Sequence, residues 1–149
     1  MTDPRELYQQ VILEHNKKPR NFGKLEPCSH HAHGLNPLCG DDIEVTLMVE
    51  NGLIADIKFC GHGCAISQAS SSLMTVNVKG KSVTEAEAIA AQFREMIRGD
   101  LNPSEDRNML GRLSLFQGVK DLPSRVKCAV LPWATLQSAF KGEDVTSTE

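Results

Sequence analysis

The chain of 149 residues has no excess of positive charge and no long apolar run. Sixteen lysine and arginine residues stand against nineteen aspartate and glutamate residues, which leaves a net charge of −3. Such a chain lacks the basic excess that binding to a nucleic-acid backbone usually needs. No apolar stretch reaches the roughly 18 residues of a membrane span, so neither a nucleic acid nor a membrane is an expected partner.

The first residues also lack the basic and apolar regions of a secretory signal peptide. We therefore expect a cytoplasmic protein, whose five cysteines remain thiols in a reducing compartment. The sequence contains no C-x-x-C pair, no zinc-ribbon spacing and no phosphate-binding loop with a lysine. Grouped cysteines in such a compartment favour metal binding or sulfur chemistry over a disulfide framework.

The composition fits a single domain over 1–149, at about 100–200 residues per domain. Apolar and polar residues alternate over 43–49 and 53–59, on either side of an Asn51-Gly52 turn, which predicts a β-hairpin. Apolar residues recur at three- and four-residue spacing elsewhere, which predicts helices near 3–17, 65–79, 83–98, 104–117 and 124–140. We therefore predict an α+β fold, in which a small antiparallel sheet has helices packed on one face.

Several local features set the expected ends of these elements. Asp3 is expected to cap the first helix, and Ser82 begins a capping box for the third. Pro132 lacks an N–H group, so we expect it in the first turn of the last helix or at a kink. A short strand is expected near 28–34, and the polar tail of 142–149 is expected to be flexible.

Three cysteines stand where two predicted elements meet. Cys39 lies in a loop that enters the first hairpin strand, Cys64 lies between the second strand and a helix, and Cys128 lies near the start of the last helix. Side chains at such boundaries can converge on one point, and a helix N-terminus favours the thiolate form of a cysteine. Asp41 follows Cys39 by two residues, so its carboxylate can reach a shared ion.

This set of side chains is open to three interpretations. Three thiolates and one carboxylate match a closed tetrahedral zinc site, with Zn–S distances near ~2.3 Å, and the same set can hold an iron–sulfur cluster. Buried cysteines are also common core residues without a metal, and spacing alone does not separate the three. The zinc site would be negatively charged, so Arg125 and Lys127 beside Cys128 are candidates to surround it with positive charge, and His62 is a candidate for a supporting hydrogen bond.

Three motifs around these cysteines carry a family resemblance. They are Asn36-Pro37-Leu38-Cys39-Gly40-Asp41, Gly61-His62-Gly63-Cys64-Ala65-Ile66-Ser67 and Arg125-Val126-Lys127-Cys128-Ala129. Together they resemble the cysteine motifs of the SufU proteins, a branch of the IscU/NifU N-terminal family of iron–sulfur assembly factors. The resemblance runs from Leu7 to about Phe140. Lys127 stands where the scaffold (IscU) branch has a histidine, and 102–122 resembles an insertion of the SufU branch.

The resemblance implies an IscU-like fold and a zinc site formed by Cys39, Asp41, Cys64 and Cys128. It also implies sulfur transfer, because SufU-like proteins accept persulfide sulfur from the cysteine desulfurase SufS and pass it toward a downstream Suf scaffold. In that family the counterpart of Cys39 is the zinc ligand that leaves, so Cys39 is the expected acceptor of a sulfurtransferase. The alternatives are a scaffold that builds and transfers a [2Fe–2S] cluster, and a zinc-stabilised interaction module without turnover.

The remaining cysteines and a histidine tract are expected to have no role in this site. Cys60 is interpreted as a small core residue at a strand end, and Cys28 as an ordinary free thiol. His30, His31 and His33 form a run typical of metal binding. A solvated loop or strand edge is the preferred interpretation of this run.

Overall fold

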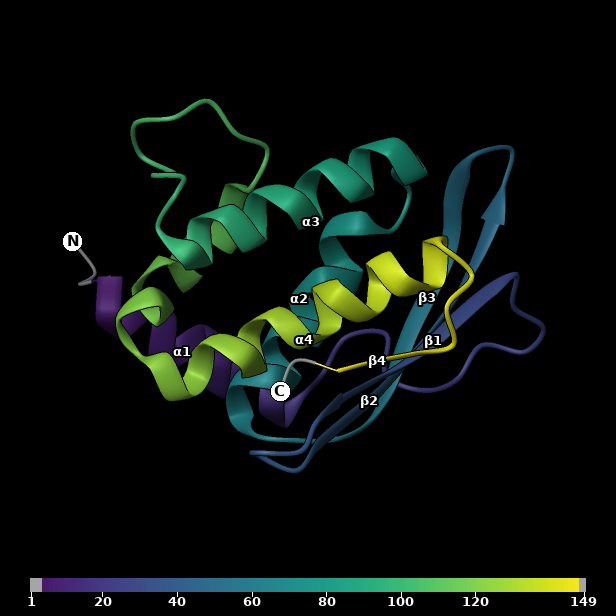
Figure 1. Cartoon of the computed structure of the whole chain (residues 1–149), viewed down its shortest axis with the longest axis horizontal. Helices are drawn as coiled ribbons and strands as arrows, with labels where there is room; N and C mark the ends of the chain where they lie inside the picture. Colours follow the sequence, from purple (N-terminus) through teal and green to yellow (C-terminus); the bar gives the residue numbers. More distant parts are fainter. Residues whose placement is uncertain (1–3, 148–149) are drawn as a thin grey trace.

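The computed structural model of the protein describes residues 4–147, so the predicted cap at Asp3 lies outside the described residues. The elements follow in the order α1 (Pro4–Lys17), β1 (His30–Asn36), β2 (Asp41–Glu50), β3 (Leu53–His62), α2 (Ala65–Val78), α3 (Val83–Arg98), the 3₁₀ helix η1 (Gly111–Asp121), α4 (Pro123–Phe140) and β4 (Val145–Ser147) (Figure 1). None of the described helices is long and apolar enough to cross a membrane.

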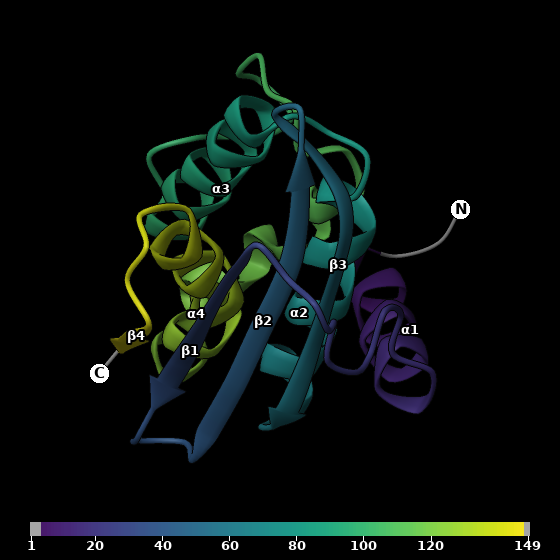
Figure 2. The same ribbon diagram turned by 90° about the vertical axis from the view of Figure 1, so that its right-hand side faces the viewer.

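The sheet has four strands in the order β3-β2-β1-β4, and the helices gather on one of its faces (Figure 2). Neighbours among β1, β2 and β3 are antiparallel, whereas β4 runs parallel to β1. The α+β fold with helices on one face is confirmed, but the sheet is mixed rather than antiparallel. The reason is the tail, because residues 145–147, which we expected to be flexible, pair with residues 33–35 of β1.

The hairpin of β2 and β3 is confirmed, but its predicted alternation fails on β3. A strict alternation over 53–59 would put Ala55 on the apolar face with Ile57 and Phe59, yet Ala55 is exposed, and Ile54 is buried instead. A bulge explains the difference: Met48 pairs with Asp56 and the next residue, Val49, pairs with Ile54. Ala55 is therefore the extra residue, and the inward and outward faces exchange at this point.

Helices α2 and α3 begin as their sequences predict. The Cys64 sulfur accepts a hydrogen bond from the Ser67 N–H at the start of α2. Ser82 accepts from the Glu85 N–H, and the Glu85 side chain accepts in return from the Ser82 N–H, which completes the predicted capping box.

One helix prediction is corrected by the structure, and one is narrowed to a single alternative. The segment near 104–117 was expected to form a regular helix, and it forms the 3₁₀ helix η1 over 111–121. Its buried residues are three positions apart, which matches the three residues per turn of a 3₁₀ helix; they are Leu113, Phe116 and Val119. Pro132 lies inside α4 rather than in its first turn, so of the two expected positions the one at a kink remains.

The core forms on both sides of α4. Helices α2 and α4 pack on the sheet, while α3 and η1 pack on α4 from outside. Trp133 of α4 is fully buried and stacks on Phe93 of α3, with ring centroids 5.0 Å apart. Phe93 also meets Phe116 of η1 edge-on at 5.6 Å. Because α4 is held from both sides, Cys128 near its start has a fixed position relative to the sheet.

His15 joins α1 to α2 through a buried polar contact. Its Nδ1 lies 2.6 Å from Ser72 Oγ, and the same oxygen accepts a hydrogen bond from the Arg20 N–H at 2.8 Å. Burial lowers the pKa of His15 below its ordinary value of about 6.5. As the pH falls below about 6.5, the unfolded chain takes up a proton more readily than the folded protein, so stability decreases.

We therefore expect His15→Gln to weaken the pH dependence of folding. The variant removes the proton uptake, so its free energy of unfolding should fall less than that of the wild type between about pH 7 and pH 5. Urea unfolding followed by circular dichroism at both pH values measures this difference. The same loss of stability in both proteins would show that His15 does not contribute to the pH dependence of folding.

Candidate metal centre

The three predicted cysteines meet at one end of the sheet. Cys39 lies in the turn between β1 and β2, Cys64 follows β3 and caps α2, and Cys128 lies in the second turn of α4. The β1–β2 turn and the end of β3 lie together at the lower end of the sheet in Figure 2. Residues far apart in the sequence are thus brought together by strand pairing and by the packing of α4 on β1.

Cys39, Asp41 and Cys128 form the tightest part of this group. One donor atom from each side chain lies within 4.8 Å of the others. The Cys128 thiol donates to Cys39 Sγ across 3.5 Å. Cys128 is fully buried and Asp41 is 2% exposed, whereas Cys39 faces solvent. The group therefore has a fixed inner side and an accessible outer side.

Asp41 is held in place by three hydrogen bonds. Its Oδ1 accepts from the Cys64 N–H at 2.8 Å and from Ser67 Oγ at 3.2 Å. Its Oδ2 accepts from Asn36 Nδ2 at 3.3 Å. The same Asn36 amide also lies 3.6 Å from Cys128 Sγ. These contacts fix the carboxylate beside the thiols, which is what an oxygen ligand of a metal requires.

Gly63 is required at its position by this carboxylate. A Cβ atom at residue 63 would lie 2.6 Å from Asp41 Oδ1 and 2.4 Å from Ser67 Oγ, closer than real Cβ contacts allow. Any larger residue would have to displace the carboxylate or the hydroxyl that holds it. The backbone between β3 and α2 therefore approaches the site closely only because residue 63 has no side chain.

Cys64 lies beside the tight group rather than within it. Its sulfur accepts a hydrogen bond from the Ser67 N–H at 3.4 Å, as the cap of α2. A hydrogen bond between the Cys64 and Cys128 side chains contributes to the raised pKa of Cys128. The fourth predicted ligand therefore lies outside the group whose donor atoms are all within 4.8 Å of one another, and it would have to exchange its capping contact for a metal.

Two features set the electrostatics of the site: the burial of Cys128 and the positive charge of Arg125. Burial is the main cause that raises the pKa of the Cys128 thiol, and hydrogen bonds to Cys64, Cys39 and Asp41 add to it. The Arg125 guanidinium lies beside these sulfurs, and its hydrogen bond to Cys128 raises the pKa of Arg125. The predicted positive charge near the site is therefore supplied by Arg125.

The other two supporting candidates point elsewhere. Lys127 lines a cavity of about 400 Å³ between α3 and α4, together with Arg94 and Lys141. His62 is exposed and pairs in register with Asp42. Asp42 follows the buried Asp41 along β2, so the two side chains project from opposite faces of the strand. His62 is thereby placed on the face away from the cysteine group.

Sequence reasoning missed two residues that hold the site. Asn36 contacts both Asp41 and Cys128, and Ser67 contacts Asp41. Asn36 stands in the first cysteine motif, and Ser67 ends the second, so both were visible as motif members without an assigned role. The contacts of Asn36 with Cys128 and of Ser67 with Asp41 join residues that are distant in the sequence, and local patterns do not reveal such pairings.

The donor set fits zinc. Cysteine thiolates and aspartate carboxylates are both ligand types that zinc takes in proteins. The mutual separation of up to 4.8 Å is compatible with ligands that surround one ion after small side-chain rotations. The buried Asp41 and the adjacent Arg125 supply the orienting hydrogen bonds and the balancing charge that such a site needs.

Comparisons with known proteins show the family of this chain. The NifU-like N-terminal domain family matches residues 7–129. A protein of Streptococcus pyogenes serotype M1 named iron–sulfur cluster assembly scaffold protein IscU is 43% identical over 135 residues, which cover 91% of this chain and 83% of that protein. A protein of Bacillus subtilis (strain 168) named zinc-dependent sulfurtransferase SufU is 40% identical over 138 residues, 93% and 92% of the two chains.

Solved structures share the fold. A crystal structure from Fervidobacterium islandicum AW-1, described as a candidate iron–sulfur cluster assembly scaffold protein for the SUF system (FiSufU), matches with a TM-score of 0.83 and 37% identity, over 90% of this chain and 96% of that one. The N-terminal part of a nitrogen-fixing NifU-like protein from Brucella abortus matches with a TM-score of 0.77 and 25% identity, over 92% and 94%. The chain therefore belongs to the NifU-like N-terminal domain family of iron–sulfur cluster assembly proteins.

Proposed function

We propose that this protein is a zinc-dependent sulfurtransferase, which accepts persulfide sulfur at Cys39 from a cysteine desulfurase of the SufS type. The observation that supports this role most directly is the contrast between two thiols 3.5 Å apart. Cys39 faces solvent, whereas Cys128 is fully buried. A thiol that must meet the persulfide of another protein has to be accessible, and Cys39 is the member of the site that meets this condition.

In this proposal Cys39, Asp41, Cys64 and Cys128 hold zinc, as the donor set and its hydrogen bonds allow. Zinc bound there would keep the thiols deprotonated and would fix the loops that carry them. Asp41, Cys64 and Cys128 are the ligands that stay, because the elements around them restrain their side chains. Cys39 lies in a turn at the surface, so it can leave the group with the least change in packing.

The transfer step conserves atoms and electrons. The Cys39 thiolate attacks the outer sulfur of the desulfurase persulfide, and a new S–S bond forms at Cys39. The S–S bond within the donor persulfide breaks, and the desulfurase cysteine leaves as a thiolate. Arg125 lies beside the sulfurs and can stabilise their negative charge during this exchange. A downstream assembly protein would take the sulfur by the same exchange, and the reducing cytoplasm expected for this chain preserves the free thiols it needs.

A cluster scaffold is the second candidate function. The relative from Streptococcus pyogenes carries a scaffold name at 43% identity, and three thiols with one carboxylate are also a ligand set for iron–sulfur clusters. Lys127 stands at the position where the scaffold branch has a histidine, so the imidazole that would add a further ligand in that branch is missing here. The segment 102–122, which we propose to be the SufU-type insertion, contributes η1 to the outer layer.

Turnover of a SufS-type desulfurase distinguishes these two functions. Sulfide release from cysteine is measured with the desulfurase alone and with the zinc-loaded protein added, at several concentrations. We expect the rate to rise with the protein and to saturate, as an acceptor requires. No stimulation, together with a visible-absorbing cluster when iron and sulfide are supplied, would assign the scaffold function instead.

A further inference from the structure

Asn36 contacts three of the four proposed metal ligands from one buried position. It is the last residue of β1, and its side chain is fully buried. The side-chain Nδ2 donates to Asp41 Oδ2 at 3.3 Å and lies 3.6 Å from Cys128 Sγ. The main-chain oxygen of Asn36 accepts a hydrogen bond from the Cys39 N–H at 3.2 Å. One residue therefore contacts both sulfur ligands of the tight group, but through different atoms.

The strand register fixes this position. Asn36 and Asp41 are paired partners at the end of the β1–β2 ladder, and α4, which packs on β1, brings Cys128 to the same amide. The Oδ1 atom of Asn36 is buried and has no hydrogen-bond partner within residues 4–147. An unpaired buried acceptor costs free energy that an apolar residue of the same shape would avoid. The presence of an amide here is therefore explained by its donor end and not by stability.

The donor end of the Asn36 amide acts on the Cys128 sulfur. The NH2 group carries two hydrogens, and an Asp41 oxygen and the Cys128 sulfur accept them. A hydrogen bond from an N–H group draws electron density from a thiolate, so the sulfur becomes a weaker nucleophile and keeps one orientation. The contact of Asn36 with Cys39 is made by the main chain, so this amide does not weaken the Cys39 sulfur.

The short distance between these two sulfurs creates a side reaction for a persulfide on Cys39. The Cys128 thiolate could attack Cys39 Sγ, which is the inner sulfur of that persulfide. An S–S bond would form between the two cysteines, the S–S bond of the persulfide would break, and the outer sulfur would leave as hydrosulfide. No oxidant is required, because a persulfide is already at the oxidation level of a disulfide. The sulfurs are 3.5 Å apart, so they need to approach by only about 1.5 Å to reach an S–S bond length.

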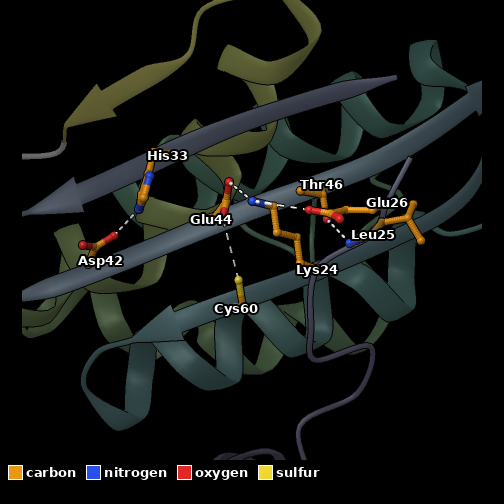
Figure 3. A network of polar contacts seen from close by, with 8 residues as sticks. All are labelled: Lys24, Leu25, Glu26, His33, Asp42, Glu44, Thr46 and Cys60. Atoms are coloured by element: carbon orange, nitrogen blue, oxygen red, sulfur yellow. Dashed lines mark hydrogen bonds and ion pairs between the residues drawn. The ribbon is translucent and has the colours of Figure 1, made fainter. Parts of the chain in front are cut away.

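A thiol on the opposite face of the sheet does not compete with Cys128 in this reaction. Cys60 was expected to be a core residue, but it lies half-buried on the face away from the helices, where its sulfur is 3.9 Å from Glu44 Oε1 (Figure 3). His33, a member of the histidine tract, is hydrogen-bonded to Asp42 on the same face. The thiol placed to release the transferred sulfur is therefore Cys128, the one that the amide contacts.

We propose that Asn36 is a positioning residue, which restrains the Cys128 sulfur and thereby retains the accepted sulfur on Cys39. The inference rests on the proposed function, because it concerns the fate of a persulfide at that cysteine. It assigns different roles to two thiols 3.5 Å apart: the exposed thiol exchanges sulfur, and the buried thiol is held by the amide. Asn36 acts through Cys128 and does not take part in the exchange itself.

The lifetime of a persulfide on Cys39 tests this role. Zinc-loaded full-length protein is treated with inorganic polysulfide, which supplies the sulfur without a desulfurase, and the excess is removed. Alkylation at intervals, digestion without reductant and mass spectrometry follow the Cys39 persulfide and the Cys39–Cys128 disulfide. Asn36→Leu keeps the shape of the side chain and removes the donor. In this variant we expect the persulfide to disappear at least about tenfold faster than in the wild type, since a lost hydrogen bond to a charged sulfur lowers the barrier by about that factor. The disulfide should form as the persulfide disappears, with release of hydrosulfide.

Cobalt absorption gives a second readout, which does not depend on sulfur transfer. In cobalt-loaded Asn36→Leu we expect the sulfur-to-metal absorption band to move to longer wavelength, because the Cys128 sulfur regains electron density. Asn77→Leu is the matched control, because the Asn77 amide donates to the Leu73 carbonyl within α2. The control should keep the wild-type persulfide lifetime and absorption. Asn36→Ala also removes the donor without adding volume, so it should give the same two changes and serves if Asn36→Leu does not fold.

Three results separate this inference from the proposed function. Equal persulfide lifetimes in the wild type and in both Asn36 variants would overturn the role of Asn36. Faster loss of the persulfide without the Cys39–Cys128 disulfide would also overturn it, because Cys128 would then not be the attacking thiol. Failure of the desulfurase to place sulfur on the wild-type protein would contradict the sulfurtransferase proposal, while the polysulfide experiment would still decide whether Asn36 restrains Cys128.

Discussion

Cys39→Ala is expected to abolish the stimulation of a SufS-type desulfurase. The increase in sulfide release above the rate of the desulfurase alone should fall by about 100-fold or more. The reason is that the acceptor sulfur is removed, and the neighbouring Cys128 thiol is fully buried and cannot replace it. The side chain of Cys39 is exposed and lies outside the core, so the fold should remain intact. Steady-state sulfide release measures the effect.

Cys28→Ala is the matched control for this prediction. Cys28 is also a free cysteine, and it lies before β1, outside the cysteine group. The Cys28→Ala variant should stimulate the desulfurase as much as the wild type does. Apart from the contribution of zinc, Cys28→Ala and Cys39→Ala should have the same melting curve by circular dichroism. Full stimulation by Cys39→Ala would contradict the assignment of Cys39 as the acceptor.

Gly63→Ala is expected to damage the zinc site although it replaces none of the proposed ligands. The added Cβ would meet Asp41 Oδ1 at 2.6 Å and Ser67 Oγ at 2.4 Å, so the carboxylate must move. Because Asp41 is buried and held by Asn36 and the Cys64 N–H, it has no alternative place close by. We expect zinc affinity to fall by at least about tenfold, or about 1.4 kcal/mol. Competition with a chromophoric chelator measures it.

Gly118→Ala is the control for a glycine substitution. A Cβ at residue 118 would have no heavy atom within 4 Å, so zinc affinity should stay at the wild-type value. Equal zinc affinity in Gly63→Ala and Gly118→Ala would show that the Asp41 carboxylate either tolerates displacement or is not a ligand. Cadmium or cobalt titration with the same two variants would separate these cases, since cobalt absorption responds to the geometry around the ion.

Much of the fold was predictable because the responsible patterns are local. The capping box at Ser82 and the alternation over 43–49 each depend on residues close in the sequence. The failures were non-local. The exposure of Ala55 depends on the register between two strands, and β4 exists only because β1 offers an edge to residues 145–147. Neither edge pairing nor register is encoded in a single segment.

The candidate centre shows the same division. The motifs pointed to Cys39, Asp41, Cys64 and Cys128. The structure brings donor atoms of all but Cys64 within 4.8 Å of one another. The supporting contacts from Asn36 cross from β1 to β2 and to α4, so they required the tertiary arrangement. Lys127 and His62 were chosen because they lie close to the motif cysteines in the sequence. His62 pairs in register with Asp42, on the opposite face of β2 from Asp41, and Lys127 lines a cavity between α3 and α4.

Detection of the transferred sulfur on Cys39 tests the proposed function most directly. The zinc-loaded protein is mixed with the desulfurase and cysteine for one turnover, quenched with an alkylating reagent, digested and analysed by mass spectrometry. We expect the peptide that contains Cys39 to gain the mass of one sulfur atom, with the added atom labelled when the substrate carries heavy sulfur. Peptides with an unchanged Cys39, while the desulfurase itself carries the persulfide, would contradict the proposal that this protein accepts sulfur.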